Sequence, residues 1–418
     1  MAGTRRRGFR TGGREARRYG RPILPGRKAG QFRFGRSFVL CLRLGRLARL
    51  AAAPGQAVVA GAGVLASVAL AAAMAIMVSS FRTSVDDWLA RLMPADLYVH
   101  AAGADSGFLD AEAVARVAAL PGVAAVEPRR FERLRLIDGR HPVTLIARPV
   151  GGGARLPLVA SLPDEALARS SVPPAWISEA LADLLGLEPG ATLELPLAGR
   201  LRPFRVAGIS RDYARQHGAV IVELADYRAA TGDTRSDDLA IGLADGARPE
   251  AVMAGLRAAL GERAVEIETP GAIRAESLAI FDRTFFVTYA MEAVAVLIGL
   301  FGIATSFAAL ATSRRGEFGM LRHLGVLRRE IGALLGIEGA LTAAVGVAVG
   351  LAAGGAIAVV LIEVINRQSF HWSMDMHLPA ATLLAFALTL VALAALAARL
   401  AGRQALRRDA VLAVREDW

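Results

Sequence analysis

Four long apolar runs dominate the pattern of hydrophobic and polar positions along the chain. Each holds about 20 or more residues, which is the length that an α-helix needs to cross the hydrocarbon core of a bilayer. We expect transmembrane helices over residues 54–81, 285–311, 333–362 and 378–400. Glycine and alanine are frequent in the first and third runs, and these small residues let helices approach one another closely in a membrane.

Between the first two apolar runs, residues 82–284 have the shorter periodicities of a water-exposed domain. The order strand, helix, strand occurs twice, first over 96–103, 108–122 and 123–128, and again over 238–246, 247–261 and 264–270. We expect these two units to pair in one layer as a split βαβ arrangement. The residues between them predict a helix and then an inserted, mostly β subdomain with turns at Gly190 and Gly199.

Two stretches beside the first two apolar runs predict helices that continue past the membrane. The first stripe consists of Phe81, Val85, Trp88 and Leu92, and the second of Ile273, Ile280 and Phe281. Apolar residues at this spacing lie on one face of a helix. We expect a pair of stalk helices between the domain and the membrane; packing of these residues only against the domain's own core is the alternative. The predicted fold class is an α-helical membrane protein with four transmembrane helices and an α+β extracytoplasmic domain.

Composition agrees with a membrane protein that has a large water-exposed part. Hydrophobic residues make up 54% of the chain and the mean hydropathy is +0.42, yet 21% of the residues are charged. The formal net charge is +11, whereas residues 1–50 alone carry +14. The basic character therefore belongs to the N-terminal tail and does not indicate a nucleic-acid-binding surface.

The N-terminal tail lacks the apolar segment of a signal peptide. We expect residues 1–34 to form a disordered basic tail. Residues 35–53 alternate apolar side chains with Arg43, Arg46 and Arg49. This spacing favours an amphipathic helix on an anionic membrane surface, with an unstructured basic segment as the alternative.

Arginine placement predicts the orientation of the spans, because cytoplasmic loops carry an excess of positive charge. The N-terminal tail, the loop 312–332 and the tail 401–418 are positive, whereas 82–284 and the short loop 363–377 are negative. We therefore expect both termini and the loop 312–332 to be cytoplasmic, in a multi-pass protein of the bacterial inner membrane.

The sequence lacks the motifs of common enzymes. Lys28 is followed by Ala29, so the chain carries no P-loop for ATP, and neither an H-E-x-x-H pair nor a G-x-S-x-G turn occurs. The single Cys41 excludes an intrachain disulfide. We expect no enzymatic activity, no bound cofactor and no metal. Residues 371–377 (HWSMDMH) include metal-ligating types, but a short loop with Trp372 at the membrane interface is the simpler interpretation.

Two acidic residues fall inside the apolar runs, Glu292 in the second and Glu338 in the third. Charge in the hydrocarbon region is costly, so such residues usually face protein or water. We expect both to couple helices, with Glu338 reaching Arg328, Arg329 or His323; snorkelling to the interface is the alternative.

The loop 312–332 has the pattern of a short amphipathic helix. Phe318, Leu321 and Leu324 share one face, and Gly325 follows as a stop signal. A short helix with apolar and cationic side chains in a cytoplasmic loop is suited to docking in a groove of a partner protein. Simple positive-inside anchoring is the alternative.

The segment RRGEFGMLRHLG in this loop resembles the Arg-x-x-Glu-Ile-Gly-x-Leu-Arg-Ala-Leu-Gly pattern of FtsX-like ABC transporter permeases, which include macrolide exporter and lipoprotein-releasing permeases. The matching residues are Arg314, Glu317, Gly319, Leu321, Arg322, Leu324 and Gly325, while Phe318 replaces Ile and His323 replaces Ala. The order of one span, a large domain and three spans is also similar. The resemblance covers about residues 36–418 and is to the C-terminal half of long, two-module members.

The resemblance implies a permease subunit that transmits movement to its outer domain. An ABC ATPase subunit, which binds the ATP, would dock on Arg314, Glu317, Phe318, Leu321, Arg322, Leu324 and Gly325. A second permease module would be a homodimer copy or a paralogue, and the chain would be a half-size permease or part of a longer one. The resemblance implies that the outer domain acts on lipoproteins, peptides, amphiphiles or cell-wall enzymes. A membrane-anchored sensor or scaffold is the main alternative, and a membrane-bound hydrolase a weaker one.

Overall fold

The computed structural model of the chain describes residues 54–101, 107–136, 141–151, 156–261 and 265–405. The tail expected over 1–34, the interfacial helix expected over 35–53 and most of the tail expected over 401–418 lie outside these residues.

Four described helices are long and apolar enough to cross a membrane. They are α2 (Pro54–Leu92), α8 (Pro270–Ser313), α10 (Arg328–Val360) and α12 (Ala380–Ala405). α10 continues through a π-helical segment, η2 (Leu361–Ile365), into α11 (Asn366–Phe370). This helical rod thus runs past residue 362, where the apolar run was expected to end, and stops at His371, whose φ is 58°.

Glycine and alanine bring the helices close together. A Cβ atom added to Gly354 of α10 would lie 2.7 Å from the carbonyl oxygen of Ala69 in α2, and one added to Gly350 would lie 2.8 Å from the Cβ of Val68. The Ser67 hydroxyl donates a hydrogen bond to the carbonyl of Ala295 in α8 (2.9 Å). The small residues of the first and third runs therefore lie at a helix–helix contact, as expected.

The two predicted strand–helix–strand units, one at each end of the α/β domain in sequence, form its first layer. The strands are β1 (Leu97–Ala101), β2 (Val123–Leu134), β9 (Asp238–Leu243) and β10 (Val265–Glu268), and the helices are α3 (Ala111–Ala118) and α7 (Pro249–Leu260). The strand order is β10-β1-β9-β2, and every neighbouring pair is antiparallel. β1 and β2 therefore flank β9, which confirms the split βαβ arrangement. Val117 of α3 and Leu256 of α7 share one core with these strands.

The inserted subdomain is mostly β, as predicted, but the long strand β2 joins it to the first layer. β2 also pairs with β3, and the order continues β3-β8-β5-β7-β4, with β6 on β7. These strands are β3 (Val143–Arg148), β4 (Leu158–Ser161), β5 (Pro174–Ser178), β6 (Thr192–Leu197), β7 (Arg200–Ser210) and β8 (Ala219–Glu223). The short helices are α4 (Asp164–Ala168), α5 (Glu179–Leu185) and α6 (Leu224–Thr231).

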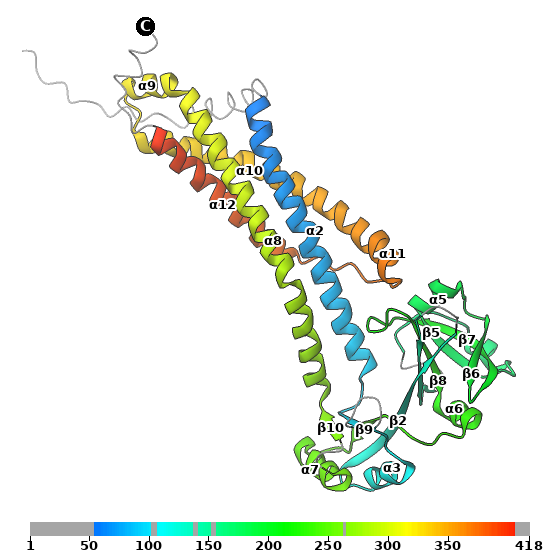
Figure 1. Cartoon of the computed structure of the whole chain (residues 1–418). Helices are drawn as coiled ribbons and strands as arrows, with labels where there is room; N and C mark the ends of the chain where they lie inside the picture. The colour runs from blue at the N-terminus through cyan, green and yellow to red at the C-terminus, as the bar shows by residue number, and fades with distance from the viewer. Residues whose placement is uncertain (1–53, 102–106, 137–140, 152–155, 262–264, 406–418) are drawn as a thin grey trace, which may run out of the picture. The chain divides into compact units, whose positions relative to one another are not determined.

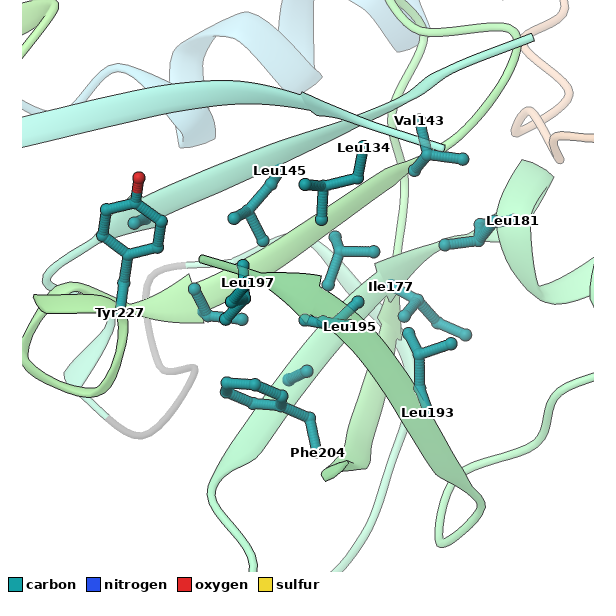
Figure 2. Close-up of a cluster of buried hydrophobic side chains, with 14 of the residues drawn as sticks. Leu134, Val143, Leu145, Ile177, Leu181, Leu193, Leu195, Leu197, Phe204 and Tyr227 are labelled. Carbon is teal, nitrogen blue, oxygen red and sulfur yellow. The ribbon is translucent and has the colours of Figure 1, made fainter. Parts of the chain in front are cut away.

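The subdomain has its own apolar core. Alternating residues of β6 and β7, with side chains of β3 and β5, point into it, and Leu195 and Phe204 are almost fully buried there (Figure 2). Ala198 and Gly199 both have positive φ, which permits the two-residue turn between β6 and β7.

Candidate docking and transmission site

Helix α9 (Arg315–His323) forms within the predicted docking loop, between α8 and α10. Gly325 has a φ of 93°, and its N–H donates to the carbonyl of Arg322 (3.0 Å). The N–H of Val326 donates to the carbonyl of Leu321 (3.1 Å), which completes a Schellman stop. The helix thus ends where the sequence predicts, and the chain turns directly into α10.

The apolar face of α9 is turned toward the chain's own helices. Phe318 is only 4% exposed and packs with Ala311, Ile331 and Leu335, and Leu321 is partly buried beside them. These side chains shield the corner between α8 and α10 from water, because α9 lies across it. Two residues expected to contact a partner therefore hold α9 in place.

The outward surface of α9 carries a different set of side chains. Glu317 is exposed, Met320 is 62% exposed, and Leu324 is 70% exposed. Large apolar residues left open beside charges are typical of a surface that receives another protein. Of the predicted docking residues, Glu317 and Leu324 lie here, and Arg322 is half-buried.

Glu338 links the docking segment to α10. Its Oε1 lies 3.4 Å from the Nη1 of Arg314, at the junction of α8 and α9. The expectation that Glu338 reaches Arg328, Arg329 or His323 is therefore corrected, because Arg314 sits nearer to this part of α10. Glu292 is half-buried in α8, and the described residues offer it no hydrogen bond or ion pair.

The stalk consists of the ends of α2 and α8 that lie nearest the α/β domain. Val85 and Trp88 are buried, and the ring of Phe81 meets that of Phe281 edge-on at 4.8 Å between centroids. Two ion pairs join the same helices, Arg82 with Asp282 and Arg274 with Asp86. Leu92 and Ile273 are half-buried, whereas Ile280 is 62% exposed. Ile280 falls outside the stripe because it is one helix step, about 100°, away from Phe281.

Both stalk helices connect to neighbouring strands, α8 through one residue after β10 and α2 through residues 93–96 before β1 (Figure 1). α2 precedes β1 and α8 follows β10, and these strands pair with Tyr98 opposite Glu268. Thr269 caps α8, its hydroxyl accepting the N–H of Ala272 (3.2 Å). Short connections therefore join both stalk helices to one pair of strands at the end of the domain's sheet.

A second attachment, which the sequence did not reveal, is the anchor loop, residues 371–377. The Ser373 N–H and hydroxyl donate to the carboxylate of Glu179 at 3.1 and 2.6 Å, and the Tyr213 hydroxyl donates to the Ser373 carbonyl (3.0 Å). Both guanidinium Nη atoms of Arg211 donate to Asp375. The hydrogen bond from Arg211 holds the pKa of the Asp375 carboxyl below its usual value, and burial raises the pKa of the Tyr213 phenol, so both groups keep these roles at neutral pH.

Trp372 is the centre of the anchor loop. Its ring is buried in a cluster with Val85, Trp88 and Tyr213, and Asn366 donates to its backbone carbonyl (2.9 Å). The ring is thus covered by the protein's own side chains, and the expected position of the loop at a membrane interface stays a prediction. Polar and aromatic residues between two apolar runs were the only sign in the sequence that this loop contacts another part of the protein. The contacts themselves could not be predicted, because the partners lie about 160 to 190 residues away in sequence. No group of three or more His, Cys, Asp or Glu side chains that could hold a metal ion occurs in the part of the chain described.

Comparison with known families indicates which class of protein combines these helices with this domain. A family model described as the MacB-like periplasmic core domain matches residues 58–259, and one described as the FtsX-like permease C-terminal matches residues 289–410. Through these two matches the chain is similar to FtsX-like ABC transporter permeases. The permease is thus a protein of the cell membrane, and the family resemblance seen in its sequence is confirmed.

A curated relative is an uncharacterized ABC transporter permease protein of Mycobacterium tuberculosis, 29% identical over 358 residues. The alignment covers 81% of this chain and 41% of the relative, so the chain spans less than half of that protein. Among solved structures, the periplasmic region of MacB from Actinobacillus actinomycetemcomitans is 12% identical, with 45% of this chain and 94% of that chain covered and a TM-score of 0.33. The extracellular domain of the noncanonic ABC-type transporter YknZ from Gram-positive bacteria is 13% identical, with 42% and 99% covered and a TM-score of 0.31.

Proposed function

We propose that this permease couples ATP hydrolysis by a separate ABC ATPase to movement of its α/β domain outside the membrane. The continuity of α8 carries the proposal. This helix runs unbroken from Pro270, beside β10, to Ser313, beside α9. Its 44 residues span about 66 Å at 1.5 Å per residue, which is about twice the 30 Å of a hydrocarbon core. Movement imposed at α9 therefore reaches the domain through a single rigid element.

The ATPase contacts the outward surface of α9 in this proposal. Glu317, Met320 and Leu324 supply one carboxylate and two exposed apolar side chains, and Phe318 supports them from behind. The Arg314–Glu338 pair extends the contact to α10, so that α8, α9 and α10 move together. ATP stays with the partner subunit, and the permease itself has no catalytic role.

The orientation follows from charge. The positive loop 312–332 and both termini face the cytoplasm, where the ATPase resides, and the α/β domain lies outside. Four spans suit half of a transporter, so a second permease module, a copy of this chain or a paralogue, completes the assembly. Work on lipoprotein, peptide or amphiphile substrates takes place at the outer domain.

The test is to co-purify the permease with the ABC ATPase from its gene neighbourhood and measure ATP hydrolysis. Glu317→Arg and Leu324→Asp should each reduce recovery of the ATPase by about tenfold, because each places a wrong charge in the contact. Glu276→Arg is the matched control: it makes the same charge reversal at an exposed position near the other end of α8. It should leave recovery unchanged.

If both variants recovered the ATPase at the wild-type yield, the outward surface of α9 would be excluded as the docking site. If ATP hydrolysis were also the same with and without the permease, a membrane-anchored sensor or scaffold would be the better description.

A further inference from the structure

Arginine side chains gather around a small cavity where the stalk meets the inserted subdomain. The cavity has a volume of about 60 Å³. Its walls include Arg129 of β2, Arg148 of β3, and Arg211 and Arg215 after β7, with Trp88 and Leu92 of α2. Phe131, Ile146, Leu156 and Ile221 supply much of the remaining wall.

Two of these arginines are buried with part of the guanidinium unsatisfied. Arg129 is 7% exposed and Arg148 is 3% exposed. On both side chains the Nε and Nη2 atoms have no hydrogen-bond partner within the described residues. Nε and Nη2 form one edge of the guanidinium, and this edge binds two oxygens of a carboxylate or phosphate at once.

The nearby acids leave this positive charge only partly compensated. Arg211 is bound to Asp375, and Arg215 to Asp212 (2.9 Å). Arg129 has a long contact with Asp238, 3.7 Å from Nε to Oδ1, and its guanidinium lies over the Tyr98 ring, 5.0 Å from the ring centre. No salt bridge is formed by Arg148 within the described residues, although the charges of Glu127 and Asp238 act on it; burial first, and then the charge of Arg129, lower its pKa.

Buried like charges side by side are unfavourable unless an opposite charge joins them. A cavity of this size holds a few water molecules or one small oxyanion. An oxyanion that reaches the two unsatisfied edges would compensate the charges as well as the hydrogen bonds, whereas water would satisfy the hydrogen bonds alone. The apolar wall beside the arginines suits the first carbons attached to such a group.

We propose that this cavity binds an oxyanion, a phosphate or carboxylate group, between the paired edges of Arg129 and Arg148. Trp88 and Leu92 belong to the stalk, so an occupied cavity sits where movement of α2 enters the inserted subdomain. The site goes beyond the proposed ATP-driven transmission. Its binding test needs no ATPase, so the two proposals fail separately.

The probes are inorganic phosphate and phosphatidylglycerol, added to the purified full chain in an uncharged detergent at constant ionic strength. The readout is the unfolding temperature together with tryptophan fluorescence. Saturable responses to phosphate indicate a free anion as ligand, and responses to phosphatidylglycerol alone indicate a lipid headgroup. Either response supports the site if it depends on the cavity arginines.

Arg148→Met removes the charge at similar volume and should abolish the response, with unfolding temperature without ligand equal to or above that of the wild type. Arg148→Lys keeps the charge but loses the two-donor edge, and should weaken binding by about tenfold or more. Arg116→Gln, an exposed arginine of α3 paired with Glu112, is the control and should respond like the wild type.

The proposal is overturned if neither probe shifts the wild type, which would mean a water-filled cavity. It is equally overturned if Arg148→Met responds as the wild type does, or if Arg116→Gln loses the response to the same degree as the cavity variants.

Discussion

At the scale of single residues, local signals were readable from the sequence and long-range partners were not. Gly325 and Gly199 stand where the backbone needs positive φ, and this requirement depends only on neighbouring residues. The partner of Glu338 and the burial of Phe318 and Trp372 depend on which helices and loops lie nearby. An amphipathic stripe shows that a face is apolar but does not show whether its own protein or a partner covers it.

Asp375 gives a prediction with a pH dependence. Its lowered pKa means that the Arg211 contact contributes stability above the ordinary aspartate pKa of about 4 and loses it as pH falls through the lowered value. The pair therefore persists at pH 5 to 7 and weakens only in stronger acid. Asp375→Asn should loosen the anchor loop at neutral pH, at a cost of less than about 1 kcal/mol because Asp375 is largely exposed.

Hydrogen exchange of residues 371–377 between pH 7 and pH 3 measures this effect. The wild type should lose protection only at the acid end, after correction for the intrinsic exchange rate. The variant should have lower protection throughout. Equal protection in both proteins at pH 7 would contradict the role given to the ion pair.

At the scale of elements, the predictions rest on hydrophobic length and small-residue spacing. Apolar runs of this length have few stable alternatives to a helix in a bilayer, so the spans were readable. The bounds of the helices were harder to predict. Residues 363–370 are more polar than the apolar run before them, yet they continue the helix as η2 and α11. The joining of the two sheets through β2 was also not readable, because one strand's two halves have different neighbours.

Gly354 and Gly355 form a matched pair for testing the contact between α10 and α2. A side chain on Gly354 would collide with Ala69 and Ala72, whereas a Cβ on Gly355 would meet nothing within 4 Å. Gly354→Leu should destabilise the protein by about 1–3 kcal/mol or more through overpacking. Gly355→Leu should not. Thermal unfolding of the two purified variants makes the comparison, and equal losses would show that helix propensity or detergent, not this contact, sets the result.

At the scale of the whole molecule, the α/β domain is attached to the membrane helices by two different kinds of connection. The stalk is covalent and helical, through α2 and α8. The anchor loop is non-covalent and polar, and it joins the α10–α12 link to Glu179 and Arg211. The stalk could be predicted from the sequence, because its helices are continuous with the apolar runs. The anchor loop depends on contacts between distant segments, which no local pattern contains.

If the domain moves relative to the α10–α12 link during transport, a covalent bridge at the anchor loop should stop the cycle. Glu179→Cys with Ser373→Cys, in a Cys41→Ser background, places two thiols at positions whose native side chains lie 2.6 Å apart. Joining them with a short bismaleimide should abolish stimulation of ATP hydrolysis by the permease. The single variant Ser373→Cys, treated in the same way, is the control. Undiminished stimulation in the bridged protein would show that the loop and the domain move as one body.

The pairing of β1 with β10 limits what kind of motion the stalk can deliver. Sliding α2 along α8 until β1 moves by one residue past β10, about 3.3 Å, would turn the side chains of the shifted strand to the opposite face and break the ladder between Tyr98 and Glu268. Tilting both helices together leaves every ladder hydrogen bond intact. In the proposed mechanism the stalk would therefore tilt as a lever and would not slide as a piston: a small angular change near α9 would become a larger lateral displacement of the domain, in proportion to the length of α8.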